Sequence, residues 1–68
     1  MTTPLRVARN KRGLTLQAVA EAVGTDTGNL SRIEMGRQVP SPRLTTALAQ
    51  LFKGEVSESQ ILVPELTA

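Results

Sequence analysis

Apolar residues recur along this chain at intervals of three and four, which is the spacing of one face of an α-helix. The clearest case is the run of Leu44, Ala47, Leu48 and Leu51, which fall on one face. No segment alternates regularly between apolar and polar residues, as a half-buried strand does. The sequence therefore predicts an all-α fold built from short helices.

Capping residues divide this pattern into five predicted helices. A threonine or serine, which can accept a hydrogen bond from the first helical turn, precedes each of them. The first is capped by Thr3 and ends at Gly13, the second spans about 16–23 after Thr15, the third about 26–35 between Thr25 and Gly36, the fourth runs from Ser41 to about Phe52, and the last covers about 58–62 after Ser57. Residues 61–63 are also consistent with a brief strand, because periodicity cannot assign so short an apolar run.

Residues 18–36 are the most informative segment, because two short helical patterns there are hinged at 23–25. Gly24 supplies the turn, and the small side chain of Ala20 allows the second helix to cross the first closely through Leu30 and Ile33. This is the sequence form of a helix-turn-helix motif, whose second helix lies in the major groove of DNA. Double-stranded DNA is therefore the predicted partner.

Base-reading candidates lie on the face of this second helix that points away from the core. That face and its flanks carry Thr27, Gly28, Asn29, Ser31 and Arg32. Arg32 is the foremost candidate, because its guanidinium fork matches the two acceptors of guanine. Thr27 suits a thymine methyl group or a hydrogen bond, whereas Asn29 fits adenine or a phosphate about equally. Gly28 either lets the helix approach the bases or is tolerated in an irregular first turn, since glycine inside a helix costs about 1 kcal/mol.

Candidate phosphate contacts flank that helix. Backbone amides at helix starts attract phosphate, and neighbouring arginine or glutamine side chains add to this attraction. The candidates are Thr15 and Gln17 at the start of the second helix, Arg37 and Gln38 after the third, and Arg43 in the first turn of the fourth. Asp26 would repel phosphate, unless its carboxylate points away and serves the helix start.

Composition narrows the classes of function. The chain has 68 residues, enough for one domain over 1–68 with an ordered core at about 4–62 and a short tail at 63–68. It has no cysteine or histidine, and no nucleophile–base pair or glycine-rich phosphate loop, so we expect no metal, no cofactor and no enzymatic activity. A single aromatic residue, Phe52, argues against binding of single-stranded nucleic acid by stacking. Short apolar runs and no signal-like segment predict a cytoplasmic protein with no membrane contact, associated with the nucleoid when bound to DNA.

Charge is divided unevenly along the chain. All eight basic residues lie within residues 1–53, whereas residues 54–68 carry three of the six acidic ones. A basic body fits phosphate and an acidic tail does not. The tail and the residues just before it contain more apolar side chains than we expect a small core to bury. The candidates for a dimer contact are Phe52, Val56, Ile61, Leu62 and Val63. We expect a weak homodimer that forms fully on DNA, where it reads both halves of the site.

Several short motifs together resemble the helix-turn-helix domain of the Cro and phage-lambda-repressor family, which includes the xenobiotic-response-element regulators. They are Arg9, Gly13-Leu14-Thr15, Ala20, Gly24, the run from Leu30 to Glu34, Gly36 and Ser41-Pro42. The resemblance covers about residues 4–62. It implies a compact five-helix domain that binds a two-fold operator as a homodimer, with repression by occupancy as the simplest mode of action.

The resemblance also implies roles for single residues. Arg9 and Glu34 match a partly buried salt bridge that fixes the orientation of the third helix. A glutamine that grips phosphate commonly follows the cap of the second helix, but this chain has Leu16 there and Gln17 one place later. The alternative function is a protein-binding module, such as an antitoxin or a regulator that docks another protein through its C-terminal segment.

Overall fold

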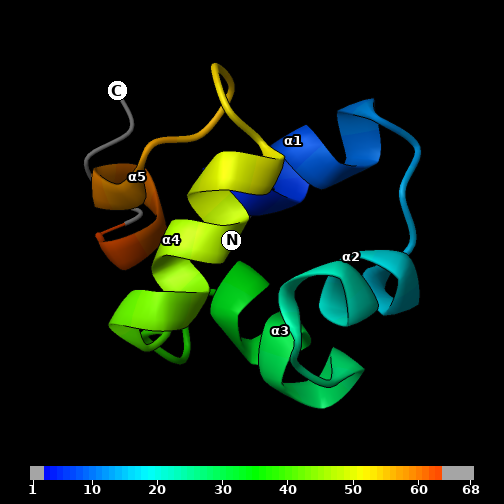
Figure 1. Cartoon of the computed structure of the whole chain (residues 1–68), viewed down its shortest axis with the longest axis horizontal. Helices are drawn as coiled ribbons and strands as arrows, with labels where there is room; N and C mark the ends of the chain where they lie inside the picture. The colour runs from blue at the N-terminus through cyan, green and yellow to red at the C-terminus, as the bar shows by residue number, and fades with distance from the viewer. Residues whose placement is uncertain (1–2, 64–68) are drawn as a thin grey trace.

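Five α-helices make up residues 3–63, the part of the chain that the computed structural model describes, and no strand occurs in that part (Figure 1). The helices are α1 Pro4–Lys11, α2 Leu16–Val23, α3 Thr27–Glu34, α4 Pro42–Leu51 and α5 Glu58–Leu62. The predicted all-α class is confirmed, and the alternative of a strand at 61–63 is wrong because α5 extends through Leu62. None of these helices has the length and apolarity that a membrane span requires.

Side-chain caps start the helices where the sequence places them, with one exception. Four predicted caps accept a hydrogen bond from the backbone amide three residues later: Thr3, Thr15, Ser41 and Ser57. At α3 the N-cap is Asp26, whose Oδ1 accepts from the amide of Asn29 at 2.6 Å. The prediction of Thr25 as this cap is wrong, because its Oγ1 accepts instead from the side-chain amide of Asn29 at 2.8 Å. As a result α3 begins at Thr27, one residue later than the pattern predicts.

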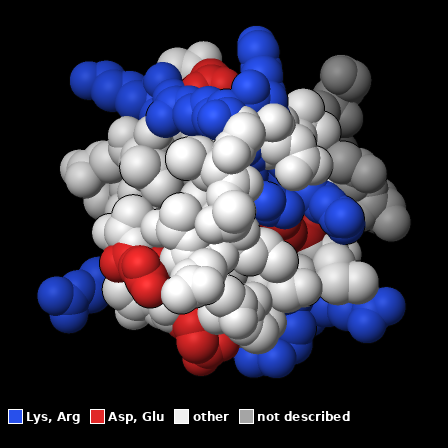
Figure 2. Space-filling model, turned by 90° about the vertical axis from the view of Figure 1, so that its right-hand side faces the viewer, with Lys and Arg blue, Asp and Glu red and all other residues white. Residues whose placement is uncertain are grey.

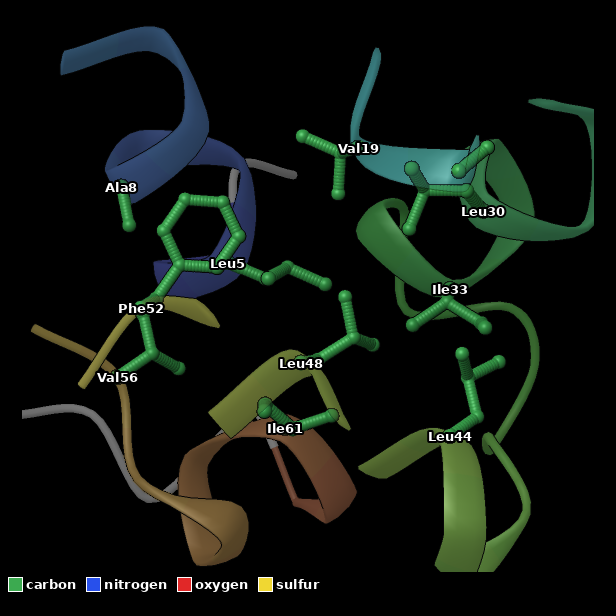
Figure 3. Packing of buried hydrophobic residues seen from close by; sticks show 11 residues of the cluster. Leu5, Ala8, Val19, Leu30, Ile33, Leu44, Leu48, Phe52, Val56 and Ile61 are labelled. Atoms are coloured by element: carbon green, nitrogen blue, oxygen red, sulfur yellow. The ribbon is translucent and has the colours of Figure 1, made fainter. Parts of the chain in front are cut away.

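The core is a cluster of apolar side chains to which every helix or its end contributes (Figure 3). The largest fully buried side chains are Phe52, Leu30, Leu48 and Val19. Figure 3 shows the ring of Phe52 lying beside Leu5 and Ala8 of α1, although Phe52 directly follows α4. Because one cluster joins all five helices, the orientation of each depends on the others.

Burial of the C-terminal apolar residues corrects one prediction. Phe52, Val56 and Ile61 are 4% exposed or less, because α5 folds back on α4 and α1 and closes the core over them. These three residues belong to the core, so their assignment to a surface contact between two copies is wrong. Leu62 and Val63 remain 41% and 42% exposed. The remainder of the predicted tail, 64–68, lies outside the described residues.

Arg12 at the end of α1 ties the end of α4 to the rest of the fold. Its Nη1 donates to the carbonyl oxygen of Leu51 at 2.7 Å, and its guanidinium lies 5.1 Å from the centre of the Phe52 ring. It also forms an ion pair with Glu55. The carbonyl groups at a helix end lack partners within the helix, so a cation from another helix stabilises this one.

The capping assignment of α3 yields a stability prediction. Asp26→Ala removes the acceptor for the Asn29 amide and is expected to lower the free energy of unfolding by about 1 kcal/mol. Asp26→Asn keeps a side-chain oxygen and is expected to lose much less. Urea unfolding followed by circular dichroism measures both. Equal losses in the two variants would contradict a capping role that depends on the oxygen acceptor.

Candidate nucleic-acid interface

Gly24 sets the angle between α2 and α3. Its φ of +79° lies in the left-handed region, where residues with a Cβ atom are strained, and the amide of Thr25 then donates to the carbonyl of Ala20 at 2.9 Å. Ala20 is 2% exposed and presents only a methyl group where α3 crosses α2. The turn thus places α3 across α2 with one face on the core and the other free (Figure 1).

The outer face of α3 carries the predicted base-reading residues. Thr27, Gly28 and Arg32 are exposed, whereas Asn29 and Ser31 are half-buried. α3 is a regular helix at Gly28, with a negative φ, so an irregular first turn does not explain the glycine. A Cβ atom at this position would lie 3.6 Å from Nη1 of Arg32 and 3.4 Å from Oδ1 of Asp26, which is ordinary contact. The glycine therefore leaves free space beside the Arg32 guanidinium rather than meeting a demand of the backbone.

A chain of side-chain hydrogen bonds crosses this face, and we call it the polar relay. Arg32 Nε donates to Oε1 of Gln38 at 2.9 Å. The Nε2 group of Gln38 donates in turn to Oδ1 of Asn29, and Nδ2 of Asn29 donates to Oγ1 of Thr25. The relay joins the α2–α3 turn, α3 and the loop before α4. It engages Asn29 and Gln38, which the sequence suggests only as separate DNA contacts.

The other phosphate candidates lie at two helix starts and in one loop. Thr15 caps α2, and the side-chain amide of Gln17 donates to Glu21 at 3.3 Å along the same helix. Arg37 and Arg43 are exposed, and neither forms an ion pair within residues 3–63. Both guanidinium groups are therefore available to an anionic partner.

A recess of about 430 Å³ lies between the α2–α3 turn and the start of α4. Its lining includes Thr25, Asn29, Ser41 and Arg43. Ser41 caps α4 by accepting from the Leu44 amide, and Pro42 has no N–H, so Arg43 carries the backbone donor left at this helix start. Val23, Leu44 and Ala47 form the apolar part of the lining, and the guanidinium of Arg43 beside the start of α4 is the part that suits an anion.

Arg9 and Glu34 lie behind α3 rather than on its outer face. Arg9 Nε is 2.7 Å from Oε2 of Glu34, and the two side chains are 11% and 3% exposed. Arg9 also donates from Nη1 to the carbonyl of Leu14, and Thr3 Oγ1 donates to the backbone carbonyl of Glu34 at 2.6 Å. The structure thus brings the two residues together as an ion pair between α1 and α3. The guanidinium of Arg9 is therefore engaged inside the protein and does not lie on the outer face of α3.

Basic side chains are unevenly distributed over the surface. Figure 2 shows basic groups at the upper margin, at the lower margin and right of the centre of one face, with acidic groups at the lower left and beside some of the basic ones. The lower group lies at the level of α3 in Figure 1. Positive charge beside an exposed helix face favours approach of a polyanion through long-range attraction.

The geometry agrees with what comparison with known proteins finds. A family model described as a helix-turn-helix domain matches residues 3–59, which include all of α1 to α4 and the start of α5. No curated protein and no solved structure matches the chain significantly. With the family match over most of its length, the chain belongs to the helix-turn-helix domain family, whose members bind DNA.

Proposed function

We propose that this protein is a sequence-specific transcriptional regulator that binds a double-stranded operator with α3 in the major groove. The observation that carries the proposal is the outer face of α3, where Arg32 is exposed next to the space left by Gly28. Two further exposed arginines follow it, Arg37 in the loop after α3 and Arg43 at the start of α4. At DNA interfaces, phosphate contacts position the protein and base contacts specify the sequence. Arg32 suits the second kind of contact, and the exposed Arg37 and Arg43 suit the first.

Arg32 is the principal base reader in this proposal. Its guanidinium can donate two parallel hydrogen bonds to O6 and N7 of guanine, the commonest specific contact in the major groove. Thr27, the first residue of α3, would touch a thymine methyl group or donate a hydrogen bond. Few other long polar side chains project from α3, so direct readout rests on a small number of positions.

Phosphate contacts come from Arg37, Arg43 and the start of α4. The recess that Arg43 lines offers a phosphate the guanidinium of Arg43 and, at the start of α4, the backbone amide of the same residue, because Pro42 has no N–H and the Leu44 amide donates to Ser41 Oγ. Asp26 carries a carboxylate at the start of α3, and its Oδ1 accepts a hydrogen bond from the amide of Asn29. There the positive end of the helix dipole offsets its charge, which lessens its repulsion of phosphate.

We further propose that two copies bind a two-fold operator and repress by occupying it. Leu62 and Val63, at the end of α5, are the two dimer candidates that remain exposed. A contact centred on them is small, so the dimer dissociates readily and forms fully on DNA. Two recognition helices about 34 Å apart would then read successive turns of one DNA groove. Repression by occupancy needs no surface beyond the DNA interface itself.

Arg32→Ala is expected to weaken specific binding by about 1–3 kcal/mol and to remove the preference at one base position in each half-site. The measurement is selection from random duplex DNA at a stated salt concentration, with Arg6→Ala as control, because Arg6 is an exposed arginine on α1. A wild-type chain that selects no sequence would contradict the proposed function. An Arg32→Ala variant with the wild-type preference would remove Arg32 from base reading.

Arg37→Ala and Arg43→Ala are expected to weaken binding to all sequences about equally. Each should also reduce the slope of log affinity against log salt by about one unit, because each variant loses one phosphate contact. Titrations of a specific and an unrelated duplex across a salt series measure this. Lys53→Ala, an exposed cation beyond the far end of α4, serves as the matched control and should leave the slope unchanged. Unchanged slopes in both arginine variants would place these residues outside the interface.

Leu62→Asp combined with Val63→Asp is expected to give a folded monomer that binds a single half-site weakly. Ile61 is left intact, because its side chain is 4% exposed and part of the core. Sedimentation with and without operator measures the assembly, and helical circular dichroism checks the fold. Binding of a full operator by two copies with undiminished affinity would show that these two residues do not form the dimer contact.

A further inference from the structure

We propose that Gln38 is a positioning residue that determines which edge of the Arg32 guanidinium faces a base. This inference rests on the proposed function, because it concerns how Arg32 reads DNA. It assigns Gln38 a different role from the phosphate contact that its place in the sequence suggests. The base it favours is guanine, read end-on through Nη1 and Nη2.

The first step concerns the mobility of Arg32. An exposed arginine side chain has four rotatable bonds, and ordering it on DNA costs conformational entropy. In this protein its Nε is already held by Gln38 Oε1 at 2.9 Å, across six residues and beyond the end of α3. Gln38 is half-buried, so the group that holds Arg32 is itself held by the fold. The base reader is thus oriented before DNA arrives.

The second step concerns the direction of the polar relay. A glutamine amide has one acceptor oxygen and one donor nitrogen, so the partner of one group decides which way the other points. The Arg32 guanidinium is a donor only, so the Gln38 amide turns its oxygen to Arg32 Nε, and its Nε2 donates to Oδ1 of Asn29. Asn29 Nδ2 then donates to Oγ1 of Thr25 at the α2–α3 turn. The two amides therefore share one consistent orientation, in which the Gln38 oxygen faces Arg32.

The third step concerns the donors that remain. A guanidinium can address guanine side-on, through Nε and one terminal nitrogen, or end-on, through both terminal nitrogens. The contact with Gln38 occupies Nε and blocks the side-on mode. The residue next to Nη1 is Gly28, which has no side chain to crowd the end-on edge. Gln38 therefore selects the end-on mode, and Gly28 is compatible with it.

The first test uses the free protein and needs no DNA. Gln38→Ala should make the Arg32 Nε–H proton exchange with water about fivefold faster, as loss of one hydrogen bond implies. Nitrogen-15 NMR measures the exchange, and Gln50→Ala, an exposed glutamine on α4, is the matched control. If circular dichroism shows that Gln38→Ala is unfolded, Gln38→Met replaces it, since it keeps the volume without the acceptor. Unchanged exchange in the folded variant would overturn the proposal.

The second test uses sequence selection on random duplex DNA. Gln38→Ala should flatten the guanine preference at the position read by Arg32 and leave the salt slope unchanged. Gln38→Glu retains an oxygen acceptor for Nε and should restore that preference. On an Arg32→Ala background, Gln38→Ala should change nothing further at that position, because Gln38 acts through Arg32.

The outcomes separate the two proposals. A preference that Gln38→Ala leaves intact, together with a shallower salt slope, would make Gln38 a phosphate contact and overturn the positioning role. A wild-type chain that selects no sequence would overturn the proposed function instead, while the exchange measurement would still report whether Gln38 holds Arg32.

Discussion

The buried carboxylate of Glu34 is the constraint on which the placement of α3 depends. A charged group that is 3% exposed is tolerable only with an opposite charge and hydrogen bonds around it, and Arg9 supplies the charge from α1. Arg9 is anchored to the carbonyl of Leu14, and Thr3 holds the backbone carbonyl of Glu34 itself. α1 and the loop after it are thereby fixed against the end of α3. The outward direction of α3, and hence the place of Arg32, follows from this arrangement.

Local signals explain why most of the fold is predictable from the sequence. Capping by Thr3, Thr15, Ser41 and Ser57 involves only the first turn of each helix, so neighbouring residues suffice to identify it. At α3 two adjacent polar residues compete for that role. The side chain of Asn29 donates to Thr25, and its backbone amide donates to Asp26. The spacing of apolar residues does not indicate which of the two residues caps the helix. The sequence therefore predicts the start of α3 one residue too early.

Long-range packing explains what the sequence did not reveal. The apolar pattern near the chain end predicts an apolar helix face, but it does not show whether this face packs inside the monomer or against a second copy. In the structure the apolar face of α5 packs on α4 and α1. Phe52, Val56 and Ile61 are therefore core rather than interface. The contact of Gln38 with Arg32 depends likewise on the path of the loop after α3. The sequence shows that Gln38 and Arg32 are polar, but the path of the loop determines that their side chains are in contact.

The shortness of α3 has a consequence for protein engineering. It is eight residues long, whereas an isolated helix in water needs about 12–15 residues to be even marginally stable. Packing against the surrounding helices therefore stabilises the helical conformation of α3, and a synthetic peptide of this segment would not retain it. Transplanting DNA specificity into another scaffold would require more than the helix. The transferable unit is the stretch 25–38, because it carries the threonine, asparagine and glutamine that hold the arginine in place.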